Sequence, residues 1–252
     1  MSLKPKNQHA QEDPWASLKE FTKARIALGN VGGSLPLNEV LAFKLAHAHA
    51  KDAIYSNLDL ELFTQQFAQS GIPIFKLKSR VSNRQEYLKR PDLGRKLAKT
   101  SIIKLRKENS TFDIVFVISD GLSANGVNYH AIEVLKKMLP SYVETHKIAI
   151  ALVEQGRVAI ADEIGELLQA KFTAVMIGER PGLSSPQSMG IYTTYAPKPG
   201  LTDEKRNCIS NIHEDGLSHE AASNILCYLI EQSFARKISG VELKVELGSL
   251  KK

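Results

Sequence analysis

The sequence has few of the features that would place the chain in an oxidising compartment or a membrane. Only two of its 252 residues are cysteines, Cys208 and Cys227. Two are too few for a disulfide framework, and no paired CxxC spacing indicates zinc. The first residues contain no apolar signal segment, and no apolar run approaches the ~20 residues of a membrane span. These absences predict a cytoplasmic protein in a reducing compartment, with no membrane contact.

Charge of one sign is not concentrated anywhere along the chain. The formal net charge is +6, a balance that is also found in nucleic-acid-binding proteins. The lysines and arginines are interleaved with acidic residues, however, so the pattern favours a solvated surface, with docking onto an acidic partner protein as the alternative. We therefore expect no nucleic-acid partner. With 43% hydrophobic and 24% charged residues, the composition is that of an ordinary globular protein.

The first part of the chain is predicted to be mainly helical. Residues 1–14 are polar and are expected to form a flexible leader. Residues 15–110 form the predicted helical N-terminal region, with a possible short strand at 74–77. Periodicity and capping signals predict its helices at 14–27, 38–54, 59–70 and 91–107.

The remaining residues, 111–252, alternate between strand and helix patterns. Residues 113–119 have the sequence DIVFVIS, a run typical of a strand that is buried on both faces. Further strands are predicted at 147–153, 172–177 and 191–195, and helices at 128–139, 162–170 and 218–236. Because strands alternate with helices, the strands are expected to be parallel. The sequence thus predicts an α/β fold in which a helical N-terminal region precedes a Rossmann-like, doubly wound, mainly parallel sheet.

Three polar segments that contain glycine directly follow predicted strands. They are SDGLS at 119–123, EQGRV at 154–158 and GERPG at 178–182. In a doubly wound sheet, ligands bind at the carboxyl ends of the strands. These segments are therefore the candidate site.

Several familiar chemistries lack their motifs. No GxGxxG follows the first buried strand and no GxxxxGK[ST] occurs, which disfavours a dinucleotide or ATP site. Ser119 and Ser123 are not in a GxSxG elbow, which argues against a serine hydrolase. His47 and His49 are two residues apart on a predicted helix and point to different sides, so they are poorly spaced for a metal. We assign no metal ligand in this chain.

Six motifs, in order along the chain, resemble the small subunit of ethanolamine ammonia-lyases. They cover most of the chain from about residue 15 to 240, and six in order are highly specific. The motifs are KARIALGNVGGSLP (23–36), RVSNRQEYLKRPDLGRKL (80–97), VISDGLSANGVNYHAI (117–132), EQGRVAIADEIGELL (154–168), IGERPGLSSPQSMGIYTTYAPKPG (177–200) and RNCISNI (206–212).

This resemblance implies a reaction in which ethanolamine becomes acetaldehyde and ammonia by a radical mechanism that depends on adenosylcobalamin. It implies a large subunit, a TIM barrel that carries the substrate pocket and the catalytic residues. The small subunit covers part of the cobalamin, and the two assemble into a higher oligomer of heterodimers. The chain lacks a DxHxxG pattern, so the cobalamin is expected to keep its own lower ligand. Some relatives have a longer N-terminal extension linked to bacterial microcompartments; the short leader here favours cytoplasmic residence, with encapsulation through the partner still open.

Three residues match the family's cobalamin contacts: Val158, Glu179 and Cys208. Glu179 is expected to accept hydrogen bonds from corrin amides, Val158 to offer backbone groups or an apolar face, and Cys208 to fit close to the ligand. Taken singly, each has a structural alternative: an ion pair with Arg180 for Glu179, and core packing for Val158 and Cys208.

Other assignments stay open at this stage. Ser119 and Asp120 either touch the cofactor or cap the following helix. Two other classes of function also compete with the lyase subunit. A free-standing Rossmann-like enzyme would hold a complete pocket within this chain, and a nucleic-acid-binding protein would show affinity that falls steeply with salt.

Overall fold

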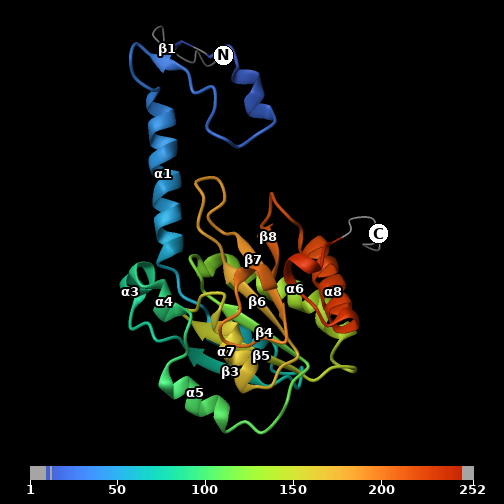
Figure 1. Ribbon diagram of the computed structural model, residues 1–252. Helices are drawn as coiled ribbons and strands as arrows, with labels where there is room; N and C mark the ends of the chain where they lie inside the picture. Colours follow the sequence, from blue (N-terminus) through green and yellow to red (C-terminus); the bar gives the residue numbers. More distant parts are fainter. Residues whose placement is uncertain (1–9, 12, 246–252) are drawn as a thin grey trace.

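In the computed structural model, which describes residues 10–11 and 13–245, a layered α/β body carries a long projecting N-terminal arm (Figure 1). The predicted leader falls mostly outside the described residues, namely at residues 1–9 and 12. Within the leader, β1 (Ala10–Gln11) pairs antiparallel with β2 (Asn30–Val31) at the far end of the arm. The arm joins the body through helix α1 (Leu37–Ile54), which confirms the helix predicted at 38–54.

The prediction of a helix at 14–27 is wrong. Only a short 3-10 turn forms there, η1 (Ala16–Glu20), and none of its residues is buried. Isolated helices shorter than about 12–15 residues are marginal in water. Without a surface to pack against, the local helical pattern of this segment is not enough to extend the turn.

The body is built on one six-stranded sheet in the order β3-β5-β4-β6-β7-β8. The first four strands in this order are parallel, β7 is antiparallel to β6, and β8 is antiparallel to β7. This arrangement confirms the predicted α/β fold with a mainly parallel sheet. The strands are β3 (Ile74–Lys78), β4 (Ile114–Ser119), β5 (Ile148–Glu154), β6 (Phe172–Gly178), β7 (Met189–Tyr195) and β8 (Asn207–Ile212).

Two strands differ from the expected pattern. β7 runs antiparallel because residues 179–188, which link it to β6, contain no crossover helix, and a parallel connection needs one. β8 was not predicted. Its sequence, NCISNI, is largely polar, and only Ile209 and Ile212 are buried.

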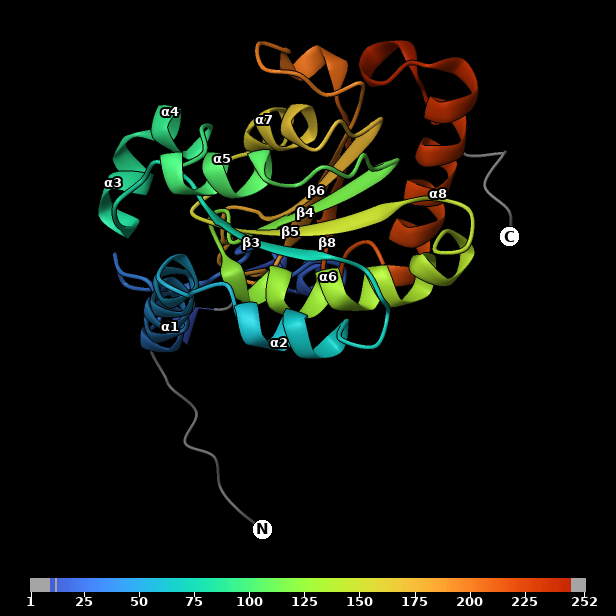
Figure 2. The same cartoon turned by 90° about the horizontal axis from the view of Figure 1, so that it is seen from below.

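Helices cover both faces of the sheet (Figure 2). Helices α2, α6 and α8 pack on one face, and α5 and α7 on the other. The central strand β4 contributes to both cores, since Ile114, Phe116 and Ile118 face one side and Val115 and Val117 the other. The helix bounds are α2 (Leu60–Gln66), α3 (Arg84–Lys89), α4 (Pro91–Gly94), α5 (Lys99–Arg106), α6 (Ala124–Met138), α7 (Ile160–Leu167) and α8 (His219–Arg236).

The helix predicted at 91–107 is interrupted between α4 and α5. Leu97 lies in the break, is fully buried in the core and forms an isolated bridge with Ser79. This tertiary contact overrides the local helical preference. The boundary predicted at residue 110 stays a prediction, but β3 pairs with β5 from Ile74 to Lys78, so the sheet also includes residues before that boundary.

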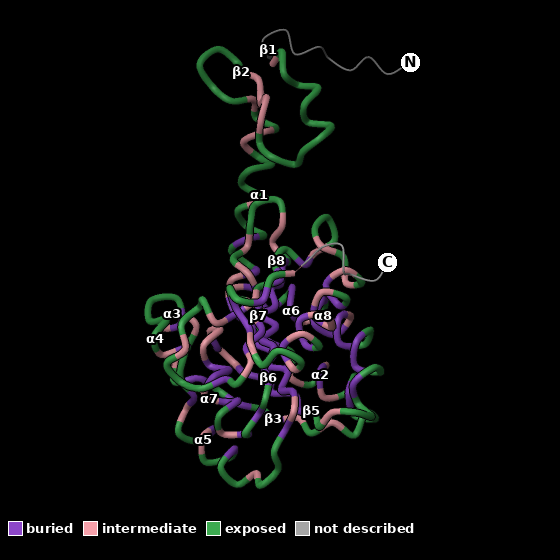
Figure 3. Tube along the Cα trace, turned by 45° about the vertical axis from the view of Figure 1, so that its right-hand side comes forward, coloured by how far each residue is buried: buried purple, intermediate pink, exposed green. Residues whose placement is uncertain are grey.

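Burial is concentrated in the body and sparse in the arm (Figure 3). Trp15 and Phe21 in the arm are 67% and 84% exposed, and Leu37 at the start of α1 is 71% exposed. Within the described residues, these large apolar side chains have no buried surface to pack against. Among the described residues, no helix is both long and apolar enough to cross a membrane.

Candidate functional site

The site lies where two neighbouring parallel strands send their helices to opposite faces of the sheet. β4 and β5 are adjacent, and the helix after β4, α6, packs on one face. The helix after β5, α7, packs on the other face. Such a reversal opens a crevice at the carboxyl ends of the strands, which is where doubly wound folds bind ligands. The segments at 119–123, 154–158 and 178–182 border this crevice, as the sequence predicts.

Ser119 and Asp120 tie the first two of these segments together. The Ser119 hydroxyl accepts a hydrogen bond from Gly156 N at 3.0 Å, and Asp120 Oδ1 accepts one from Gln155 N at 2.8 Å. Both residues are buried. The N-cap of α6 is Ser123, so neither Ser119 nor Asp120 caps that helix. Both hold the loops after β4 and β5 in position.

Burial dominates the electrostatics of Asp120. It raises the pKa of this carboxyl group to about 6, although the Arg84 guanidinium opposes the shift. Arg84 Nη1 lies 3.6 Å from Asp120 Oδ2, and Arg84 Nε donates to Ile54 O at 2.6 Å. The same guanidinium therefore links the end of α1 to the carboxyl end of β4.

Tyr87 in α3 forms a buried wall beside the loop after β5. Its hydroxyl donates to Gly156 O at 3.0 Å. The guanidinium groups of Arg84 and Arg157 lie over its ring, 4.6 and 4.1 Å from the centroid. Burial raises the pKa of Tyr87, so the phenol stays protonated and acts as a donor.

Two glycines let the loops after β4 and β6 approach each other closely. Gly121 has a φ of +56°, a conformation that favours glycine. A Cβ atom at Gly178 would lie only 2.0 Å from Ser123 O. Larger residues at these two positions would force the loops apart and open the crevice.

An open cavity of about 470 Å³ occupies the crevice. Val158 and Glu179 both line it, so the structure brings these two predicted residues together. Cys208 is not among the lining residues, but it lies opposite Tyr192 in the β7–β8 pairing, and Tyr192 does line the cavity. The complete lining is Tyr87, Gly121, Leu122, Arg157, Val158, Ile177, Gly178, Glu179, Arg180, Tyr192, Ser210 and Asn211.

Glu179 is held at the rim of the cavity by donors from strand β8 and from the end of the loop between β6 and β7. Its carboxylate accepts hydrogen bonds from Asn211 N at 3.2 and 3.3 Å and from the Ser188 hydroxyl. Gly190 leaves room for this carboxylate, since a Cβ atom there would lie 3.0 Å from Glu179 Oε1. Among the ion pairs of the described residues, none joins Glu179 to Arg180. The side chain is anchored but half-buried, so one edge stays accessible.

Val158 and Cys208 sit in different surroundings. Val158 is half-buried and packs partly against the core below α7, so its side chain serves the core as well as the cavity. Cys208 is exposed rather than buried. Partial desolvation raises the pKa of its thiol, and the negative charge of Glu179 adds to the shift. Cys208 is therefore a neutral thiol at neutral pH.

Several lining residues were not found from the sequence. Tyr87 comes from a segment predicted to be part of the helical region, and Ser210 and Asn211 from the unpredicted strand β8. The two buried isoleucines in NCISNI are three residues apart, a spacing that does not match the two-residue alternation of a strand, so the local pattern gave no signal for β8. Tyr192 on β7 packs against the core and also lines the cavity.

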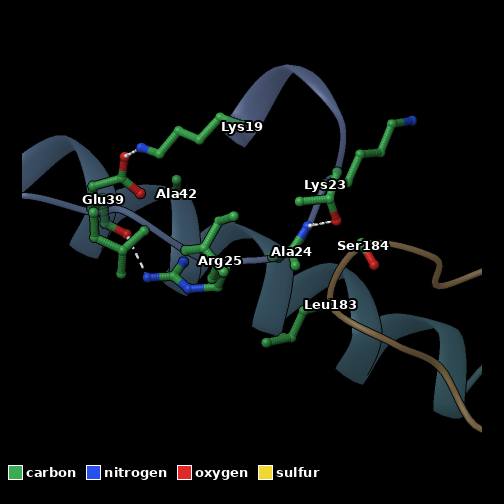
Figure 4. Close-up of a pocket in the computed structure, with 12 residues that line it drawn as sticks. Lys19, Lys23, Ala24, Arg25, Glu39, Ala42, Leu183 and Ser184 are labelled. Carbon is green, nitrogen blue, oxygen red and sulfur yellow. Dashed lines mark hydrogen bonds and ion pairs between the residues drawn. The ribbon is translucent and has the colours of Figure 1, made fainter. Parts of the chain in front are cut away.

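A second cavity, of about 550 Å³, lies between the arm, α1 and the loop that links β6 to β7, which contributes Leu183 and Ser184 (Figure 4). Its charged groups bond to the protein itself. Lys19 Nζ lies 3.1 Å from Glu39 Oε1, and Arg25 Nη2 donates to Glu39 O at 3.3 Å. Within the described part of the chain, no group of three or more His, Cys, Asp or Glu side chains could hold a metal ion.

Comparisons with known proteins agree with the six motifs. The family model described as "Ethanolamine ammonia-lyase light chain (EutC)" matches residues 12–244. The ethanolamine ammonia-lyase small subunit of Azotobacter vinelandii (strain DJ) is 47% identical over 243 residues, which cover 94% of this chain and 90% of that protein. The small subunit of Pseudomonas putida (strain W619) is 46% identical, with 93% of this chain and 89% of that protein covered.

Proposed function

This chain belongs to the ethanolamine ammonia-lyase light-chain family and is a subunit of that lyase, and from this premise we propose that it forms one side of an adenosylcobalamin site that a large subunit completes. The lyase converts ethanolamine to acetaldehyde and ammonia. The small subunit binds and orients the cofactor, and the large subunit carries the substrate pocket and the catalytic residues. Pairs of the two chains assemble into a higher oligomer.

One observation carries the proposal. Val158 and Glu179, which come from two separate motifs of the family, line the same cavity at the carboxyl ends of β5 and β6. This is the position at which doubly wound folds bind their ligands.

The donor and acceptor chemistry of the cavity fits a corrinoid. A corrin ring carries amide groups around its edge, and each amide nitrogen needs an acceptor. An ionised carboxylate has about four acceptor positions. Glu179 uses some of them for Asn211 N and the Ser188 hydroxyl, which leaves capacity for a corrin amide. Charged acceptors make the stronger hydrogen bonds.

The other two residues contribute shape. Val158 offers a half-buried apolar surface beside the carboxylate, against which the edge of the ring can pack. Cys208 is small, uncharged and exposed on β8, so it allows close approach without adding a charge. Arg157 and Arg180 line the cavity and can donate to amide oxygens.

This chain forms only one side of the proposed cofactor site. The cavity is open, and a corrin ring with its side chains is larger than it can enclose. The exposed apolar side chains of the arm support a protein partner that covers this part of the molecule. When bound, adenosylcobalamin supplies a carbon radical by homolysis of its cobalt–carbon bond.

Reconstitution of the two-subunit enzyme tests whether the catalytic residues lie in the large subunit. The purified chain alone should show no deamination of ethanolamine with adenosylcobalamin, and activity should appear when the large subunit is added. Deamination by the isolated chain would refute the proposal.

Glu179→Gln tests the cofactor contact. Gln keeps the shape and an acceptor oxygen but loses the charge, so it should weaken cobalamin binding by the two-subunit complex about tenfold, the difference between a charge-assisted and a neutral hydrogen bond. The KM for ethanolamine at saturating cofactor should not change. An unchanged dissociation constant for cobalamin would remove Glu179 from the site.

A further inference from the structure

The loop between β6 and β7, residues 179–188, begins at Glu179 and returns beside it. Glu179 N donates to Ser188 O at 3.0 Å, which closes the base of the loop. The Ser188 hydroxyl donates to the Glu179 carboxylate. Together with the hydrogen bonds from Asn211 N, the position of the returning end of the loop, Pro186 to Ser188, therefore sets the position of the carboxylate.

Helix α6 holds that returning end at successive residues. The Ser123 hydroxyl, at the start of the helix, donates to Pro186 O at 3.0 Å. One turn further on, Gly126 packs directly on the loop backbone, where a Cβ atom would lie 2.9 Å from Ser188 O. His130 Nε2 lies 3.0 Å from Gln187 O.

The hydrogen-bond partners of His130 define its tautomer. Gln187 O can only accept, so His130 Nε2 carries the hydrogen. In the neutral ring Nδ1 is then an acceptor, and it lies 2.7 Å from His219 Nε2 on α8, which must donate. Burial lowers the pKa of His130, and His219 and His213 lower it further.

The titratable groups around this histidine pair come from several elements. His213, Glu214 and Asp215 lie on the turn between β8 and α8 and line the same cavity as His130 and His219. Lys23 of the arm pairs with Asp215. The histidine pair thus joins α6, α8 and the β6–β7 loop behind the proposed cofactor site.

We propose that His130 is a positioning residue for cofactor binding: its Nε2–H holds the Gln187 carbonyl and thereby places the Ser188 hydroxyl on the Glu179 carboxylate. This inference deepens the proposed function and rests on the role of Glu179 in it. His130 itself touches no cofactor. It acts through the backbone of Gln187 and Ser188, whereas Glu179 makes the contact.

A matched pair of substitutions separates the hydrogen bond from packing. Gln has a side-chain nitrogen at the same number of bonds from Cα as His Nε2, so His130→Gln keeps a donor for Gln187 O. His130→Met has a similar length and no donor. His213→Gln is the control, because this histidine lines the same cavity and, within the described part of the chain, its side chain makes no hydrogen bond.

The readout is the dissociation constant of adenosylcobalamin, measured by absorbance titration of each variant co-purified with the large subunit. His130→Met should raise the constant about fivefold, the worth of one neutral hydrogen bond. His130→Gln should restore it to within about twofold, and His213→Gln should match the parent protein. In a Ser188→Ala background, His130→Met should have no further effect, because the link to Glu179 is already broken.

Each contrary result has a distinct meaning. Equal weakening by His130→Gln and His130→Met would assign the residue to packing and overturn the inference. An additive effect of His130→Met and Ser188→Ala would do the same. Normal affinity in His130→Met, with weakened affinity in Glu179→Gln, would refute the positioning role but leave the proposed function intact. Normal affinity in Glu179→Gln would instead refute the proposed cofactor contact.

Discussion

Replacing Asp120 with asparagine should change how the stability of the chain depends on pH. The folded chain raises the pKa of Asp120 from 3.8 to about 6, mainly by burial. Between these values the folded state keeps a proton that the unfolded state has lost. The contribution of this group to stability is therefore full below pH 3.8 and is lost as the pH rises through about 6.

The size of the effect follows from the shift. Each pKa unit corresponds to about 1.36 kcal/mol, so between pH 7 and pH 4 the wild-type chain should gain about 2 kcal/mol relative to Asp120→Asn. Asn can still accept the hydrogen bond from Gln155 N that Asp120 Oδ1 accepts. Asp120→Asn also removes the charged partner of Arg84. This loss changes the difference in unfolding free energy by an amount that does not depend on pH, because a guanidinium keeps its charge over this range.

Urea unfolding at several pH values, followed by circular dichroism, measures the difference. The stability of the wild-type chain minus that of the variant should rise as the pH falls from 7 to 4. Asp92→Asn is the control, since Asp92 is exposed, pairs with Arg90 and has a lowered pKa. For this variant, the stability of the wild-type chain minus that of the variant should fall as the pH falls. A pH-independent difference for Asp120→Asn, or one that grows toward pH 7, would refute the reasoning.

Two further substitutions test the packing of the body: one at a buried ion pair between Arg206, which precedes β8, and Asp162 on α7, and one at the close approach of the loops after β4 and β6. Arg206→Met should destabilise the chain by about 3–5 kcal/mol in urea unfolding, because it leaves the buried Asp162 carboxylate without its bidentate partner; a loss below about 1 kcal/mol would contradict this. Gly178→Ala should cost about 1–3 kcal/mol or more, since its Cβ would meet Ser123 O at 2.0 Å. Gly182→Ala, whose nearest neighbour lies 3.6 Å away, should leave the unfolding midpoint unchanged, and equal midpoints for both alanine variants would count against the close approach of the loops.

The central sheet could be predicted from the sequence because burial on both faces leaves a strong pattern. β4 is a continuous apolar run, and every residue from Ile114 to Ser119 is buried. β8 left almost no pattern, because it lies at the edge of the sheet and several of its side chains face solvent. A half-polar edge strand cannot be separated from a loop by periodicity alone.

Helix errors arose where tertiary contacts and local preference disagree. Residues 14–27 have a helical signal but no buried face, and most of the segment forms no helix. Leu97 lies within a helical pattern, yet its burial and its bridge to Ser79 break the helix. The missing helix and the break at Leu97 both depend on contacts with distant parts of the chain, so local sequence patterns do not predict either of them.

The part of the candidate site formed by loops that follow predicted parallel strands could be predicted from the sequence. The loops carrying Val158 and Glu179 follow predicted strands, and parallel strands bring their carboxyl ends together. Tyr87 and Asn211 reach the same cavity from α3 and the end of β8. Their positions in the cavity depend on packing between segments far apart in the chain, and no spacing in the sequence predicts that packing.

A structure of the two-subunit complex with adenosylcobalamin bound is the most direct test of the cofactor site. The corrin edge should lie against Val158, with an amide of the ring within hydrogen-bond distance of the Glu179 carboxylate. The large subunit should cover the opposite side of the ring. A corrin bound elsewhere, with the carboxyl ends of β4, β5 and β6 facing solvent, would contradict the proposed role of this chain.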